Sequence, residues 1–255
     1  MYPLLHELLS DKKGSIVFTC FGPWHLLYMA VILTAILALL FRLRGKSPAV
    51  QQRAVDGALC FSFGLYMADF FLMPFAYGAI DLEKLPFHVC TAMCVMCFLA
   101  RRQPQLEKLQ LPLAVLALAS NLIYTVYPAG VGWYLVHPLS YRVIQTLLFH
   151  GSMTAYGVLF LAYGGQRPTW KKCGQTLPVI VAMTLWAMLG NWLYNGTSGS
   201  YDHFFNWFFV LQDPFYLLPA SAAPYIMPFV MIVVMFTAAV LVYAGWFAAQ
   251  KLFQK

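Results

Sequence analysis

The segment LPFHVC at residues 85–90 places a histidine two positions before a cysteine. An ionised cysteine is a strong nucleophile, and an imidazole is a common base for removing its proton. Pro86 is typical of the first turn of a helix, which would place Cys90 close to a helix N-terminus. The unpaired N–H groups of a helix N-terminus favour a thiolate. We therefore expect Cys90 to be an acidic thiol that can attack a carbonyl carbon.

His88 and Cys90 are not expected to form a pair with each other. Two positions along a helix correspond to a rotation of about 200°, so their side chains would point in opposite directions. The base for Cys90 would then come from another segment, with His150 and His25 as the candidates. His88 would be left to pair with Asp69, a carboxyl group inside another apolar run.

The elements that would hold these residues are membrane helices. The chain has 255 residues, of which 61% are hydrophobic and 10% are charged, with a mean hydropathy of +0.69. Soluble domains have about 45–50% apolar and about 25% charged residues. The sequence therefore predicts an all-α polytopic integral membrane protein. Its net charge of +7 does not indicate nucleic-acid binding, because the basic residues fall between apolar runs and form no patch.

Seven runs are long enough for about 20 residues of membrane helix. They cover residues 19–41, 57–79, 85–101, 109–127, 143–164, 175–195 and 224–248. We expect them to form a single domain over residues 1–255. The connection 196–223 is rich in aromatic residues, which favours an outer segment at the membrane interface, lying in its plane or acting as a lid.

The basic residues predict the orientation of the seven helices. Twelve of them fall on the side of the C-terminus: Arg42, Arg44, Lys46, Arg53, Arg101, Arg102, Lys108, Arg167, Lys171, Lys172, Lys251 and Lys255. Four fall on the other side: Lys12, Lys13, Lys84 and Arg142. Because cytoplasmic loops carry an excess of Lys and Arg, the C-terminus is predicted to be cytoplasmic and the N-terminus outside.

Polar side chains inside the seven runs gather in the outer half of the membrane. The set comprises His25, Asp69, His88, Cys90, Asn121, His150 and Asn191. Ionisable groups inside a membrane are costly and by default indicate function, although a single Asn or His also commonly links two helices. The whole set predicts one polar cavity facing the exterior.

Four short stretches, FGPWHLL (21–27), LPFHVC (85–90), FHGS (149–152) and GNWLYNG (190–196), resemble the sequence blocks of the YwaF-type integral membrane proteins, which are related to the animal transmembrane protein 164. The animal relative is described as a phospholipid acyltransferase that uses a cysteine. The resemblance implies that Cys90 carries the acyl group and that His150 or His88 is the base. It also implies a bacterial plasma-membrane protein whose partner is membrane phospholipid.

Three functions remain open on the sequence. The first is a lipid acyl-transfer enzyme with a Cys90 nucleophile, in which Asn121, Asn191 or a helix-terminal N–H would stabilise the oxyanion. The second is a carrier for a small solute that uses Asp69 and the histidines. The third is a lipid- or partner-binding membrane protein without chemistry. No cofactor is expected, and no local motif supports a zinc site built from His25, His88, His150 and Asp69.

Overall fold

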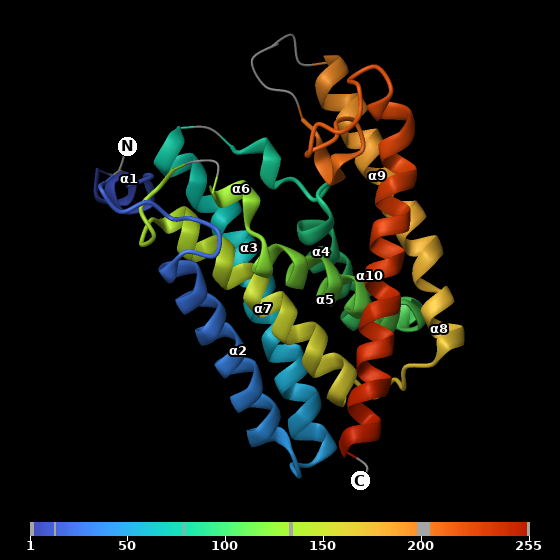
Figure 1. Cartoon of the computed structure of the whole chain (residues 1–255). Helices are drawn as coiled ribbons and strands as arrows, with labels where there is room; N and C mark the ends of the chain where they lie inside the picture. Colours follow the sequence, from blue (N-terminus) through green and yellow to red (C-terminus); the bar gives the residue numbers. More distant parts are fainter. Residues whose placement is uncertain (1–2, 13, 79, 133–134, 198–204, 254–255) are drawn as a thin grey trace. The chain divides into compact units, whose positions relative to one another are not determined.

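The computed structural model of the chain describes residues 3–12, 14–78, 80–132, 135–197 and 205–253. Within these ranges the chain folds into helices and contains no strand, which confirms the all-α prediction there (Figure 1). Four parts of the predictions lie outside the described residues: Lys13, Lys255, position 79 at the end of the run 57–79, and positions 198–204 of the aromatic-rich segment.

The described residues form ten α-helices and three short 3-10 helices. In chain order these are α1 (Pro3–Leu9), α2 (Pro23–Leu43), α3 (Pro48–Tyr77), η1 (Leu82–Lys84), α4 (Val89–Arg102), η2 (Pro104–Leu109), α5 (Gln110–Val126), α6 (Ala129–Gly132), α7 (Tyr141–Tyr163), α8 (Trp170–Gly174), α9 (Thr176–Thr197), η3 (Trp207–Phe209) and α10 (Ala223–Phe253).

Six segments of the described chain are long and apolar enough to cross a membrane, so this is an integral membrane protein. They are Pro23–Leu43, Pro48–Phe75, Pro104–Val126, Tyr141–Tyr163, Trp170–Asn195 and Ala223–Lys251. Six of the seven predicted spans correspond to these segments. The run predicted at 85–101 corresponds to α4, whose 14 residues extend about 21 Å, against the roughly 30 Å of a bilayer core.

Proline marks the beginning of the first two long helices. Pro23 follows Gly22 at the start of α2, and Pro48 follows Ser47 at the start of α3. A proline in the first helical turn is favourable because its missing N–H would have no partner inside the helix and its φ angle is already helical. These prolines explain why α2 and α3 begin where they do, although the apolar run of α3 starts later.

Contacts group the chain into two compact units. The first contains residues 1–81 and 120–166, and the second contains residues 82–119 and 167–255. Helix α5 contributes its beginning to the second unit and its end to the first. The single domain expected over the whole chain stays a prediction.

In the first unit, helix α7 packs against both α2 and α3 (Figure 1). The Ser62 hydroxyl of α3 donates a hydrogen bond to the Ser152 hydroxyl of α7 at 2.8 Å. On another side of α7, a Cβ atom placed on Gly151 would lie 2.8 Å from the side chain of Ile32 in α2. Small residues therefore let α7 approach both neighbours closely, as is usual for helices inside membranes.

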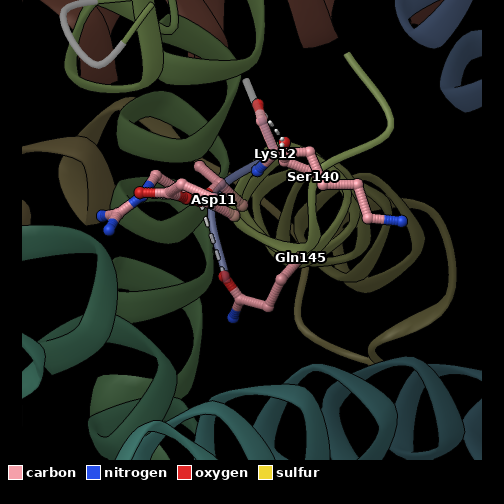
Figure 2. A network of polar contacts seen from close by, with 6 residues as sticks. Asp11, Lys12, Ser140 and Gln145 are labelled. Carbon is pink, nitrogen blue, oxygen red and sulfur yellow. Dashed lines mark hydrogen bonds and ion pairs between the residues drawn. The ribbon is translucent and has the colours of Figure 1, made fainter. Parts of the chain in front are cut away.

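The segment after α1 fixes the beginning of α7. Asp11 forms an ion pair with Arg142 at 3.0 Å between Oδ1 and Nε, and the backbone N–H of Lys12 donates to the Ser140 hydroxyl at 3.1 Å. Figure 2 shows Asp11 and Lys12 beside Ser140 and Gln145. These contacts hold the first turn of the helix that carries His150.

In the second unit, α9 packs against α10, and η3 contacts both of these helices. The short helix α4 packs against η2, which leads into α5. Three predicted site residues, His88, Cys90 and Asn191, belong to this unit. The other four, His25, Asp69, Asn121 and His150, belong to the first unit.

Candidate functional site

Cys90 lies in the first turn of α4 and is 5% exposed. The helix begins at Val89, and His88 is its N-cap residue, with extended backbone angles (φ −79°, ψ 143°). The predicted position of Pro86 in the first turn was therefore wrong, because Pro86 precedes the helix. The expected place of Cys90 near a helix N-terminus is confirmed.

The same geometry removes the reason for separating His88 from Cys90. The rotation of about 200° applies only when both residues are helical, and His88 is outside the helix. Its carbonyl accepts a hydrogen bond from the Thr91 hydroxyl at 3.0 Å, which fixes the backbone at this point. His88 therefore remains a candidate base for Cys90 within the same unit.

Phe87, next to His88, is held in a slot of aromatic rings. Its ring stacks on Trp186 at a centroid distance of 4.9 Å and lies at the same distance from Trp207. Gly190 forms one wall, because a Cβ atom at that position would overlap the ring of Phe87. The indole N–H of Trp186 also donates to the Pro86 carbonyl at 2.8 Å. These contacts fix the chain just before His88 and Cys90.

Two asparagines of α9 bind the backbone of Phe205 and of Trp207, the first residue of η3. The Asn191 amide donates to the Trp207 carbonyl at 3.0 Å, and its oxygen accepts from the Trp207 N–H at 2.9 Å. Asn195 makes the same two bonds with Phe205, both at 2.8 Å. Each side chain therefore satisfies one N–H and one C=O of a segment that has no strand partner.

The spacing of the two asparagines fits that segment. Positions 191 and 195 are about one turn apart on one face of α9, so both side chains can reach the same short stretch of chain. Asn191 and Asn195 therefore meet Trp207 and Phe205, whose side chains lie on the same side and stack at 4.5 Å. We call residues 205–209 the clamped segment.

The clamped segment contacts the residues before α4. Phe209 meets the His88 imidazole edge to face at 5.4 Å, and the Trp207 indole N–H donates to the Glu83 carbonyl at 3.4 Å. Phe208 and Phe209 have positive φ angles of 59° and 53°, a strained conformation for residues with a side chain. The strain is offset by packing, since Trp207 and Phe208 are almost fully buried.

His25, in the first unit, connects two helices and is fully buried. Its Nδ1 accepts the Phe21 N–H at 2.9 Å, so the proton of the neutral ring is on Nε2, which donates to the Thr125 carbonyl at 3.0 Å. Both nitrogens are bonded to backbone groups. The geometry favours a link between the beginning of α2 and the end of α5 over the expected roles as a base or a cavity-lining group.

His150 lies in α7 and stacks on Tyr124 of α5, with ring centroids 4.0 Å apart. Its Nδ1 is 2.7 Å from the Thr146 carbonyl one turn earlier. A carbonyl can only accept, so Nδ1 carries a proton and Nε2 is the basic nitrogen of the neutral ring. His150 keeps a nitrogen of the right kind for the base role.

Asp69 and Asn121 are also buried in the first unit. The Asp69 carboxyl group is hydrogen-bonded to the Tyr141 hydroxyl at the beginning of α7. The Asn121 amide donates to the Ser120 hydroxyl at 3.3 Å, and its backbone carbonyl accepts from the Thr125 hydroxyl at 2.8 Å. The expected pairing of Asp69 with His88 and the single shared cavity would involve both units and stay predictions.

Gly190, Asn195 and Phe87 were not among the predicted site residues. The signal for Asn195 was its spacing from Asn191, because positions i and i+4 share a helix face. The packing of the Phe87 ring against Gly190 has no comparable sequence signal. Within the described ranges, no group of three His, Cys, Asp or Glu side chains could hold a metal ion.

The six apolar helices define a polytopic helical membrane protein, and the four sequence blocks lie on or next to its helices. A family model described as the TMEM164 family matches residues 20–247, so the chain belongs to this family. The match confirms the resemblance drawn from the four blocks. No curated protein and no solved structure was found to match.

Proposed function

We propose that this TMEM164-family protein is a membrane-embedded lipid acyl-transfer enzyme with Cys90 as its nucleophile. The observation that carries the proposal is the position of Cys90, which is buried in the first turn of α4, two residues after His88, whose ring contacts Phe209 of the clamped segment. Unpaired backbone N–H groups at a helix start favour a thiolate and can also stabilise an oxyanion.

The reaction has two steps. The Cys90 sulfur attacks the carbonyl carbon of a phospholipid ester and the C–O bond breaks, leaving a thioester on the enzyme and a lysophospholipid alcohol. A histidine takes the thiol proton and gives it to the leaving oxygen. An acceptor alcohol then attacks the thioester, its proton passes to the histidine, and the thiol is restored.

His88 is the first candidate for this histidine, because it belongs to the same unit as Cys90 and contacts the clamped segment. His150 is the second, because its Nε2 is the basic nitrogen of the neutral ring. The clamped segment would exclude water, which favours transfer over hydrolysis. Asn191 holds the clamped segment in place and does not take its expected oxyanion role, since its amide group is bonded to the backbone of Trp207. Asn121 remains a candidate oxyanion donor.

The test uses the purified protein in phosphatidylcholine and phosphatidylethanolamine liposomes with a labelled acyl chain and a lysophospholipid acceptor. Cys90→Ala is expected to abolish both transfer and the hydroxylamine-sensitive acyl adduct on the peptide that contains residue 90. Cys94→Ala is the matched control, because Cys94 is buried on the same helix. Normal transfer by Cys90→Ala would remove the nucleophile, and normal lipid binding without any transfer would favour a non-catalytic lipid-binding protein.

A small-solute carrier is the second candidate, favoured by the buried Asp69 carboxyl group and its bond to Tyr141. Intramembrane carboxyl groups often bind substrates or relay protons. Solute uptake into proteoliposomes that Asp69→Asn abolishes and Cys90→Ala leaves intact would favour this function over acyl transfer.

The topology in this proposal is the seven-crossing arrangement in a bacterial plasma membrane, with the N-terminus outside. Helix α4 and the preceding residues 82–88 would form the short crossing. The uneven distribution of Lys and Arg supports it. Reporter fusions to the two ends of the chain test it: seven crossings place the ends on opposite sides, whereas six place them on the same side.

A further inference from the structure

The connection between α9 and α10 contains two aromatic regions with opposite exposure. In the clamped segment, Phe205, Trp207 and Phe208 are at most 5% exposed. A few residues later, Phe215, Tyr216 and Leu217 are 68%, 92% and 81% exposed. We call residues 213–218 the exposed turn. Three consecutive large apolar side chains directed outward form a surface that needs a partner of apolar character.

Asp213 builds the exposed turn. Its Oδ1 accepts the Phe215 N–H at 2.8 Å, and its Oδ2 accepts the N–H groups of Leu217 and Leu218 at 2.7 and 3.0 Å. Tyr216 has a positive φ of 56°, which the bonds around it maintain. The turn therefore directs its charge toward its own backbone and its apolar side chains away from it.

The surface continues along α10. The sequence contains no Asp, Glu, Lys, Arg or His between Asp213 and Lys251. Tyr225 and Phe229, in the first turns of α10, are 77% and 70% exposed. An open apolar groove follows on the same helix, lined by Tyr225, Ile226, Phe229, Val230, Val233 and Val234. Since α10 is long and apolar enough to cross a membrane, the exposed turn lies next to the point where it would enter the lipid.

We propose that the exposed turn is a membrane anchor that inserts Phe215, Tyr216 and Leu217 into the boundary between headgroups and acyl chains, in the leaflet opposite the end of α10 that carries Lys251. Aromatic side chains are enriched at this depth, where one part of the ring is in hydrocarbon and the hydroxyl reaches water. The neighbouring clamped segment would thereby be held at the depth of lipid ester groups. The anchor does not depend on the chemistry of Cys90.

Photocrosslinking in liposomes tests the anchor. A p-benzoylphenylalanine residue replaces Tyr216 in one variant, Phe229 in a second and Arg167 in a third. Phe229 is an exposed residue of the apolar α10 face, and Arg167 is an exposed charged residue of the connection between α7 and α8, outside the six apolar segments. After illumination, mass spectrometry locates the lipid carbon that has reacted.

The variant at position 216 is expected to give lipid adducts at a level comparable to position 229, attached near the glycerol and first acyl carbons, whereas position 229 reacts deeper in the chain. Position 167 is expected to give few adducts. Adding Asp213→Asn should reduce the adducts at 216 but not those at 229, because an amide presents only one oxygen to the three N–H groups.

Three outcomes would overturn the proposal. Position 216 could give no lipid adduct while 229 does, it could crosslink to a second copy of the chain, or it could react at the same depth as 229. Each of these results is independent of whether Cys90→Ala abolishes acyl transfer, so the anchor and the proposed function can fail separately.

Discussion

Buried and partly buried polar side chains bond to different kinds of partner in the two units. In the first unit they join one helix to another, as Ser62 does with Ser152 and His25 with the carbonyl of Thr125. In the second unit, Asn191 and Asn195 join a helix to a chain segment with little helical structure.

The difference follows from what each partner lacks. A helix satisfies its own backbone groups except at its ends, so one donor or one acceptor is enough to link two helices. A buried segment outside the α-helices has both N–H and C=O groups to satisfy, and an asparagine side chain offers donors and an acceptor in the same plane. Non-helical backbone at membrane depth occurs where it is buried in protein or lines a cavity. The comparison therefore supports placing the proposed acyl transfer in the second unit.

The largest expected effect contrasts one glycine from each unit. Gly190→Ala would force a Cβ atom into the ring of Phe87, which is held between Trp186 and Trp207 and cannot move aside. Overpacking of this kind costs about 1–3 kcal/mol, and we expect a loss near the upper end together with loss of acyl transfer. Thermal unfolding in detergent and the liposome assay measure the two effects.

Gly151→Ala is the matched substitution in the first unit. Its Cβ atom would lie 2.8 Å from both Cδ1 and Cγ1 of Ile32, and that side chain can change rotamer. We expect a smaller loss of stability than for Gly190→Ala. A larger loss for Gly151→Ala would show that the helix contacts of the first unit are the less tolerant of the two.

The second-largest effect is expected from removing the asparagine side chains that hold the clamped segment. Asn191→Ala removes two hydrogen bonds and leaves the N–H and C=O of Trp207 without their side-chain partner, at a cost of about 1–3 kcal/mol for each buried group. Hydrogen exchange should increase at residues 205–209 and change little in α2 and α7. Asn195→Ala is expected to have a weaker effect of the same kind, since its bonds are only partly buried.

Faster exchange throughout α9 and α10 in Asn191→Ala would contradict this prediction. It would mean that the clamp supports the whole second unit and not only the clamped segment. Unchanged exchange at residues 205–209 would mean that aromatic packing alone holds the segment in place.

A third, smaller effect tests the helix links of the first unit. His25→Phe keeps an aromatic ring but loses the bonds to Phe21 and Thr125, so we expect a loss of about 1–2 kcal/mol of stability and faster exchange at residues 20–23. Exchange at the clamped segment should not change. If acyl transfer per folded molecule also fell, His25 would have a role beyond linking helices, and the contrast between the two units would weaken.

The sequence predicted what depends on local pattern. Apolar run length located six long helices, and the residues around Pro86 placed Cys90 near a helix start, although the helix begins three residues after that proline. The hydrogen bonds between Asn191 and the clamped segment could not be predicted from the sequence, because the partners of Asn191 are backbone atoms of a segment without periodicity. The partner of His25 is a carbonyl 100 residues away, and no spacing rule connects the two.

The smallest expected effect is on the exposed turn, the part of the second unit that the asparagines do not hold. Hydrogen bonds from the backbone N–H groups, first that of Phe215, hold the pKa of the Asp213 carboxyl group below its ordinary value of 3.8. The ionised carboxylate therefore stabilises the turn fully above that value, and this contribution is lost as the pH falls through the lower folded pKa.

Fluorine NMR of a variant with 3-fluorotyrosine at position 216, recorded from neutral pH to about pH 2.5, should show a transition confined to the acidic end of this range. In Asp213→Asn the signal should already resemble the acidic state at neutral pH. A transition near pH 6, or an unchanged spectrum in Asp213→Asn, would mean that contacts other than this carboxylate order the turn, and the difference between the clamped segment and the exposed turn would then rest on packing alone.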